Sequence, residues 1–268
     1  MTVMRKVRRT ANFDLVLEVG NEQFVRPPRA AQRHWLLNRV VREAADDLQA
    51  LDAIARRFVP GLTESVTDRT SVDRTEAELA DVDIMEDWQI PLMEVMSGLV
   101  ARPDAHLLEI GFGRGISAEV IQRHGVASHT IIECNPSVCR RFMEWRARYA
   151  ERRIELVTGK WQDTLPRLGL FDAIFFHTYA LNEAESTELL SRSVTFAESF
   201  FESAAAHLRD GGVFTYLTNE IDSIGRTHQR ALLSRFRSFS VRVVPLEIPS
   251  DVRDAWWADT MAVVVAVK

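Results

Sequence analysis

Short apolar runs alternate with segments of helical spacing in the second half of the chain. The apolar runs have the length of strands and lie at 106–110, 130–133, 154–158, 173–177 and 213–218. Continuous apolar strands are typical of sheets that are covered on both faces, and helical connections make neighbouring strands parallel. The pattern therefore predicts an α/β fold built on a mostly parallel sheet.

Two further apolar runs, at 241–248 and 261–267, are joined by a stretch without helical spacing. A connection of this kind favours an antiparallel pair over a parallel crossover, which needs a helix or a long loop. We therefore expect a seven-stranded sheet that an antiparallel C-terminal strand closes.

The first part of the chain shows a different pattern. Apolar alternation over 12–25 around a Gly-Asn pair predicts a β-hairpin, and apolar spacing over 30–59 predicts one or two amphipathic helices. Residues 61–83 are polar and lack aromatic side chains, which is typical of a linker. We expect a cap at 1–82, which covers the active site or forms a homodimer, and a larger domain at 83–268.

Composition limits the partners of the protein. The 268 residues include no run of about twenty apolar positions, and no secretory signal follows the basic N-terminus, so we expect a cytoplasmic protein without a membrane partner. The net charge is −5 and the arginines are interspersed with acids, which argues against nucleic-acid binding. The two cysteines, Cys134 and Cys139, indicate no disulfide framework and no metal site.

A glycine-rich turn follows the strand that ends near Glu109. Its sequence, 111–115, places bare backbone amides and a helix N-terminus at the carboxyl edge of the sheet, where ligands bind in open α/β folds. The register differs from the dinucleotide fingerprint, because Ile116 occupies the place of its third glycine. Glu133, at the end of the next strand, can accept hydrogen bonds from ribose hydroxyls. These features favour S-adenosylmethionine as cofactor; a tight turn beside a solvated acid is the alternative.

Trp161 and Gln162 follow the third strand and could supply an aromatic wall and a hydrogen bond for adenine. The alternative for Trp161 is an ordinary place in the core.

Several segments together resemble the guanidinoacetate N-methyltransferase family, whose members are class I S-adenosylmethionine-dependent methyltransferases with a Rossmann-like fold. The likeness runs over residues 83–268, and the E-C-N triplet at 133–135 and the W-x-x-P-x-M signature at 88–93 make it specific. The segments that carry it are 84–93, 107–115, 131–135, 159–163, 176–179 and 210–216.

The resemblance implies a methyltransferase domain at 83–268 that binds S-adenosylmethionine and a small-molecule substrate. The expected cofactor contacts are Met85, Met93, Glu109, Gly111, Phe112, Gly113, Gly115, Ile116, Glu133, Cys134, Asn135, Trp161 and Gln162.

Two positions depart from the family pattern. The family holds its cationic guanidino substrate with two carboxylates, and Gln89 and His177 occupy those positions here. Burying a guanidinium without a paired carboxylate costs several kcal/mol. We therefore expect an acceptor that is neutral or only weakly cationic.

His177, at the end of the fourth strand, is the expected general base, because a histidine suits the removal of the proton that the methylated atom sheds. Tyr179 could orient the substrate or share a proton relay. The alternatives are a hydrogen bond at a strand end for His177 and a packing role for Tyr179. The other expected substrate contacts are Glu86, Trp88, Gln89 and Thr218.

The leading hypothesis is methylation of an indole at C3. Some bacterial enzymes that resemble the family methylate tryptophan-derived compounds in this way and close a pyrroloindoline in secondary metabolism. Trp88, Phe176, Trp256 and Trp257 could then form an aromatic box around the flat acceptor.

The alternative hypothesis is N-methylation of a small amine or guanidino compound whose acidic anchors have moved, for instance to Glu86, Asp87 or Glu220. A third reading, from another class, is a non-catalytic protein that binds the cofactor.

Overall fold

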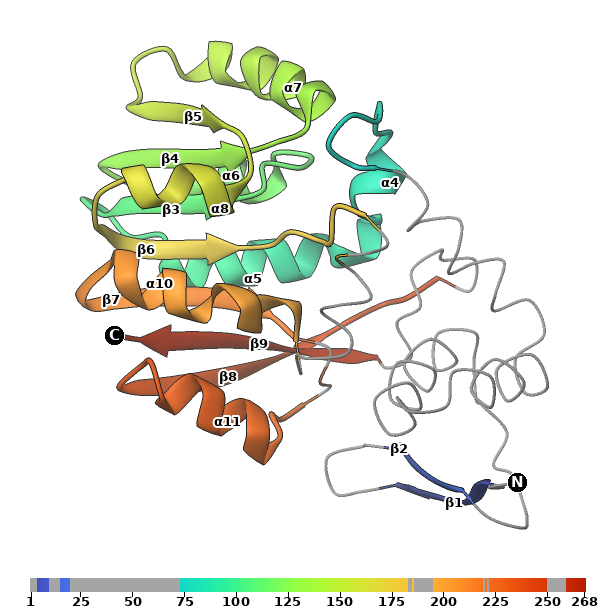
Figure 1. Ribbon diagram of the computed structural model, residues 1–268. Helices are drawn as coiled ribbons and strands as arrows, with labels where there is room; N and C mark the ends of the chain where they lie inside the picture. The colour runs from blue at the N-terminus through green and yellow to red at the C-terminus, as the bar shows by residue number, and fades with distance from the viewer. Residues whose placement is uncertain are drawn as a thin grey trace.

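The structure, a computed structural model, describes residues 4–9, 15–19, 73–182, 185, 195–218, 220, 222–249 and 259–268. Its centre is a seven-stranded sheet with the strand order β5-β4-β3-β6-β7-β9-β8 (Figure 1). The strands are β3 (His106–Ile110), β4 (Ser128–Glu133), β5 (Ile154–Thr158), β6 (Phe171–Phe176), β7 (Leu208–Leu217), β8 (Ser238–Pro245) and β9 (Thr260–Val267).

Strands β3 to β7 run parallel to their neighbours, whereas β9 is antiparallel to both β7 and β8. This arrangement confirms the predicted fold, a mostly parallel seven-stranded sheet of the Rossmann-like class I methyltransferase type with an antiparallel C-terminal strand.

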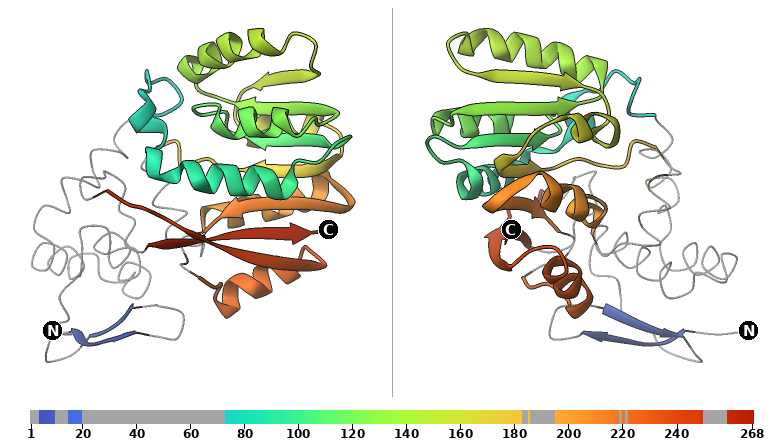
Figure 2. Two further views of the ribbon diagram at one scale, coloured as in Figure 1. Left: turned by 180° about the vertical axis from the view of Figure 1, so that it is seen from behind. Right: turned by 60° about the vertical axis from the view of Figure 1, so that its left-hand side comes forward.

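Helices cover both faces of the sheet, as Figures 1 and 2 show from opposite sides. Helices α5 (Ile90–Val100) and α6 (Ile116–Arg123) lie on one face, and α8 (Trp161–Thr164) and α10 (Phe201–His207) lie on the other. The remaining helices of the described domain are α4 (Asp81–Ile84), α7 (Pro136–Arg146) and α11 (Arg226–Leu233), with 3-10 turns at Asp87–Gln89, Ala147–Tyr149, Leu165–Arg167 and Phe196–Phe200.

Alternating residues of each central strand enter different layers of the core. In β6, Ala173 and Phe175 pack in the cluster under α5, whereas Ile174 and Phe176 pack in the cluster under α10. Because both faces are covered, neither set can be polar, which explains the continuous apolar run in the sequence.

The structure differs from the predicted elements in three places. The N-terminal strand β2 (Leu15–Val19) pairs with β1 (Met4–Arg9), which precedes it, and this pairing was not predicted. Segment 4–9 carries mostly Arg and Lys and therefore lacks the apolar signal of a strand. Residues 20–25 and the predicted helices at 30–59 lie outside the described residues.

The other two differences concern helices. The apolar spacing over about 194–208 predicts one long helix, whereas the described residues of this stretch form the 3-10 turn Phe196–Phe200 followed by the short α10. Helix α11 was not predicted, because only His228 and Leu232 of its residues are buried, which leaves a weak apolar pattern.

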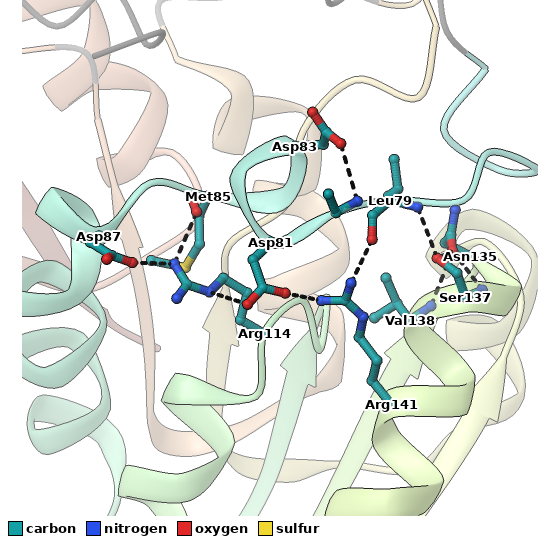
Figure 3. A network of polar contacts seen from close by, with 11 residues as sticks. Leu79, Asp81, Asp83, Met85, Asp87, Arg114, Asn135, Ser137, Val138 and Arg141 are labelled. Atoms are coloured by element: carbon teal, nitrogen blue, oxygen red, sulfur yellow. Dashed lines mark hydrogen bonds and ion pairs between the residues drawn. The ribbon is translucent and has the colours of Figure 1, made fainter. Parts of the chain in front are cut away.

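Residues 73–84 pack on the domain more closely than the predicted linker suggests. Leu79 is buried against Phe112, Phe142 and Trp145, and its N–H donates to the hydroxyl of Ser137 at 3.2 Å (Figure 3). Arg141 holds the same segment through the carboxylate of Asp81 and the carbonyl of Leu79. The boundary between a cap and the methyltransferase domain at residue 83 stays a prediction.

None of the helices in the described part of the chain has the length and apolar character needed to cross a bilayer.

Candidate functional site

The glycine-rich turn lies at the carboxyl end of the sheet, between β3 and α6. Gly111 follows the last residue of β3 and has a φ of 88°. A Cβ atom at this position would lie 2.6 Å from the carbonyl oxygen of His177. The residue must therefore be glycine for the turn to pass beside the end of β6. This contact brings the turn and His177 together.

Glu133, the last residue of β4, joins the ends of two strands. One oxygen of its carboxylate accepts from the N–H groups of Cys134 at 2.8 Å and Asn135 at 2.9 Å. The other oxygen accepts from the N–H of Phe112 at 3.0 Å. Because a carboxylate offers about four acceptor positions, Glu133 keeps capacity for a ligand hydroxyl.

Asn135 connects α7 to segment 73–79. Its Oδ1 accepts from the N–H of Ser137 at 2.8 Å, which caps α7 (Figure 3). Its Nδ2 donates to the carbonyls of Arg74 at 2.6 Å and Ala77 at 2.8 Å. Burial raises the pKa of the neighbouring Cys134 thiol to about 12, so this thiol stays protonated and unreactive.

A pocket lies between the glycine turn, segment 74–85 and the loop after β6. The predicted cofactor residues that line it are Met85, Met93, Gly111, Phe112, Gly113, Ile116, Glu133, Cys134 and Asn135. The predicted catalytic residues His177 and Tyr179 line the same pocket. The structure thus brings most of the predicted site together.

The lining also includes residues that the sequence did not predict, namely Arg74, Leu79, Ile84, Arg114, Ser117, Val138, Thr178 and Leu181. Arg114 lies within the glycine turn and Ser117 lies just after it, so their positions in the sequence could have indicated that they line the pocket. Arg74, in contrast, lies in a polar stretch without a pattern.

Glu109 does not line the pocket, in contrast to the prediction. Its fully buried carboxylate accepts from the hydroxyl of Ser117 and lies 2.9 Å from Nε2 of His129. In β3 it points to the same side as Leu107, toward the layer of α5 and α6. Gly115, also predicted, caps α6 with a φ of 75° and leaves room for the ring of Phe112.

Trp161 and Gln162 also lie outside the pocket lining. The ring of Trp161 packs edge-on against Phe200 with a centroid distance of 4.9 Å, and Gln162 is exposed. The structure therefore favours the alternative reading of Trp161 as a residue that packs on the core.

At the other end of the pocket, Tyr179 joins the two positions that depart from the family pattern. Its hydroxyl accepts from Nε2 of Gln89 at 3.1 Å and lies 3.3 Å from Nε2 of His177. Burial lowers the pKa of the His177 imidazole to about 4, so the ring is neutral at pH 7. Gln89, Tyr179 and His177 therefore form an uncharged, hydrogen-bonded group.

The predicted aromatic box is wrong for Trp88 and Phe176, because they lie in opposite layers of the core. Phe176 stacks on Phe200 at 4.5 Å, and the indole N–H of Trp88 donates to the carboxylate of Glu86 at 3.0 Å. Trp256 and Trp257 lie outside the described residues.

The predicted acidic anchors are occupied elsewhere. Asp87 pairs with Arg114 at 2.7 Å (Figure 3), and Glu86 accepts from Trp88. A carboxylate oxygen of Glu220 lies 2.5 Å from Nδ1 of His228 and accepts from the hydroxyl of Thr218. Thr218, a predicted substrate contact, is fully buried. Among the described residues, the pocket lining contains one carboxylate, that of Glu133.

The described residues contain no group of three or more His, Cys, Asp or Glu side chains with the geometry of a metal site.

With this geometry in place, comparison with known proteins identifies the family. The guanidinoacetate N-methyltransferase family model matches residues 64–233. The chain belongs to this family. This methyltransferase therefore uses S-adenosylmethionine.

Curated relatives of this methyltransferase include protein arginine N-methyltransferase 2 from two species. The protein from Eremothecium gossypii is 30% identical over 115 residues, which are 40% of this chain and 28% of the relative. The protein from Saccharomyces cerevisiae is 33% identical over 107 residues, which are 36% of this chain and 26% of the relative. The chain thus spans less than a third of the length of these relatives.

Among solved structures, a putative SAM-dependent methyltransferase from Streptococcus mutans gives a TM-score of 0.50 at 11% identity, covering 68% of this chain and 50% of that chain. A putative methyltransferase complexed with SAH, SMU.776, gives the same values. At this identity the likeness shows the fold.

Replacing Gly111 by alanine tests the geometry of the turn. Gly111→Ala should destabilise the protein by about 1–3 kcal/mol, since alanine is strained at this φ and its Cβ meets the His177 carbonyl, and it should weaken binding of S-adenosylhomocysteine. Urea unfolding and calorimetric titration measure the two effects. Gly98→Ala is the matched control, because this exposed position in α5 has open space around it and alanine favours a helix. Equal stability and affinity in both variants would contradict the assigned geometry.

Proposed function

We propose that this methyltransferase transfers a methyl group from S-adenosylmethionine to a nitrogen atom of a small amine or guanidino compound. The observation that carries the proposal is the family match over 64–233, together with a pocket in which the glycine turn and His177 lie side by side. The names of the family and of the curated relatives all refer to N-methylation.

The residues of the pocket fit the cofactor. Gly111 and Gly113 carry no side chain where the turn borders the pocket, and the Glu133 carboxylate lies beside them for the ribose. Met85 and Met93 add an apolar wall. The bound cofactor supplies an electrophilic methyl group on a sulfonium.

His177 has the properties of a proton acceptor at the reacting end. Transfer of the cofactor's methyl group to the acceptor nitrogen would release S-adenosylhomocysteine and leave an extra proton on that nitrogen. The nitrogen then sheds a proton, which the neutral imidazole of His177 can take directly or through water. Tyr179 fixes the orientation of the imidazole through the hydrogen bond to Nε2.

The uncharged group of Gln89, Tyr179 and His177 favours an acceptor nitrogen that binds in its neutral form. A protonated nitrogen has no lone pair for methyl transfer, and the described lining offers no second carboxylate to hold it. Indole C3 methylation has less support, since the predicted aromatic box around a flat acceptor does not form from Trp88 and Phe176.

A substrate panel separates the two reactions. The purified protein is incubated with methyl-labelled S-adenosylmethionine and matched sets of amines, guanidino compounds, indoles and cyclic tryptophan dipeptides, and the position of the label is determined by mass spectrometry and NMR. We expect label on nitrogen. Label on the indole C3 alone would contradict the proposal and return the indole hypothesis to first place, and absence of transfer to any acceptor would favour a non-catalytic protein.

The protonation state of His177 is directly measurable. We expect its ring signals in an NMR titration to move with a midpoint near 4, because burial lowers its pKa from 6.5. His177→Gln assigns the signals.

The same pKa shift makes stability depend on pH. Between pH 4 and pH 6.5 the unfolded chain binds more protons at His177 than the folded chain does. The contribution of His177 to stability is therefore complete above pH 6.5 and is lost as the pH falls toward 4. A midpoint near 6.5 would show a solvated histidine and remove the basis for a base that is neutral at pH 7.

A further inference from the structure

Residues 80–87 contribute to one wall of the pocket. They comprise helix α4 and the turn that follows it, and Ile84 and Met85 of this segment line the pocket together with the glycine turn. The cavity has a volume of about 70 Å³. Pockets that enclose small-molecule ligands measure roughly 300–1,000 Å³. A wall of this cavity must therefore move when a ligand as large as the cofactor enters or leaves.

Segment 80–87 lies between two fixed ends. Before it, Leu79 is buried, and its N–H donates to the hydroxyl of Ser137 at 3.2 Å. After it, Trp88 is buried in the core cluster under α5. Within the segment only Met85 is buried, and this side chain lines the pocket. A stretch with so few buried side chains can move at a lower cost than the sheet and the turn beside it.

Ion pairs fasten this segment to the glycine turn (Figure 3). Nη1 of Arg114 donates to the carboxylate of Asp87 at 2.7 Å and to the carbonyl of Met85 at 3.1 Å. Nε of Arg114 lies 3.7 Å from the carboxylate of Asp81, which also pairs with Arg141 of α7. The side chains of Asp81 and Asp87 are 62% and 81% exposed. Ion pairs of such exposed carboxylates are weak and are screened by salt, so these contacts can break and form again readily.

We propose that residues 80–87 are a gate for the cofactor, and that the ion pairs of Arg114 with Asp81 and Asp87 set how often the gate opens. Each catalytic cycle must release S-adenosylhomocysteine and admit S-adenosylmethionine, and such exchange limits the turnover of many enzymes. A ligand that passes only through the open gate binds and leaves at rates that both rise with the open fraction. This inference rests on the assignment of the pocket to the cofactor in the proposed function.

Substitution of Asp87 tests the gate, because this carboxylate pairs with Arg114 but does not line the pocket. Stopped-flow measurements give the association and dissociation rates of S-adenosylhomocysteine. In Asp87→Asn both rates should rise about threefold, as expected for the loss of an exposed ion pair, while Kd changes little. Asp87→Glu keeps the charge and should restore the wild-type rates. Glu78→Gln is the matched control, since Glu78 pairs with Arg140 outside the segment and the pocket lining, and neither rate should change.

Salt dependence tests the ion pairs in the wild-type protein. S-Adenosylhomocysteine carries one positive amino group and one negative carboxylate near pH 7, so ionic strength has little direct effect on its encounter with the protein. Both rates should rise together between ionic strengths of about 0.01 M and 1 M, over which the Debye length falls from about 30 Å to about 3 Å. In the double variant with Asp81→Asn and Asp87→Asn, this salt dependence should be largely lost.

Three outcomes would overturn the gate. One is a rise in the dissociation rate alone, with an equal rise in Kd, because the carboxylates would then stabilise the bound ligand. Another is equality of the rates in the wild type and the double variant at every ionic strength. Failure of S-adenosylhomocysteine to bind the wild type would remove the gate together with the assignment of the pocket to the cofactor. Rates that behave as predicted, in a protein that methylates no nitrogen acceptor, would support the gate and count against the proposed function alone.

Discussion

The carboxylate of Glu133 is the interaction on which the site depends. It accepts backbone N–H groups from the glycine turn after β3 and from the first residues after β4, and so fixes the ends of two parallel strands relative to each other. Charge-assisted bonds of this kind are stronger than those between neutral groups. Asn135 extends the arrangement, because its side chain caps α7 and holds segment 73–79 over the pocket. Loss of the Glu133 carboxylate would therefore loosen the glycine turn, the N-terminus of α7 that Asn135 caps, and segment 73–79 together.

The acceptor end follows a different principle, since its central groups are uncharged. Burial keeps the imidazole of His177 neutral at pH 7, and Tyr179 connects it to Gln89. Such a group orients hydrogen bonds and takes up a proton but does not attract a cation. The positive charge nearby belongs to Arg74. The lining of the pocket thus combines the carboxylate of Glu133 near the glycine turn with neutral groups near the end of β6.

The sequence predicts the sheet well, and most of the predicted cofactor residues line one pocket, because both depend on local patterns. Apolar runs predict β3 and β5 at their observed bounds, and the glycine register and Glu133 follow directly from their strands. The errors arise at positions where the direction of the side chain decides whether it faces the pocket or the core. Glu109 and Phe176 lie at strand ends near the pocket, yet the alternation of the strands turns them into the core. Arg74 reaches the pocket through contacts with Asn135 and Leu181 that are distant in sequence.

The most direct test of the account is calorimetric titration of S-adenosylhomocysteine into the wild-type protein and Glu133→Gln, with Asp163→Asn as a control at an exposed acid outside the pocket lining. We predict one binding site in the wild type, a loss of about tenfold or more in Glu133→Gln, and no change in the control. Thermal unfolding of each variant without ligand separates loss of binding from loss of the fold. Wild-type affinity in a folded Glu133→Gln would contradict the central role of this carboxylate.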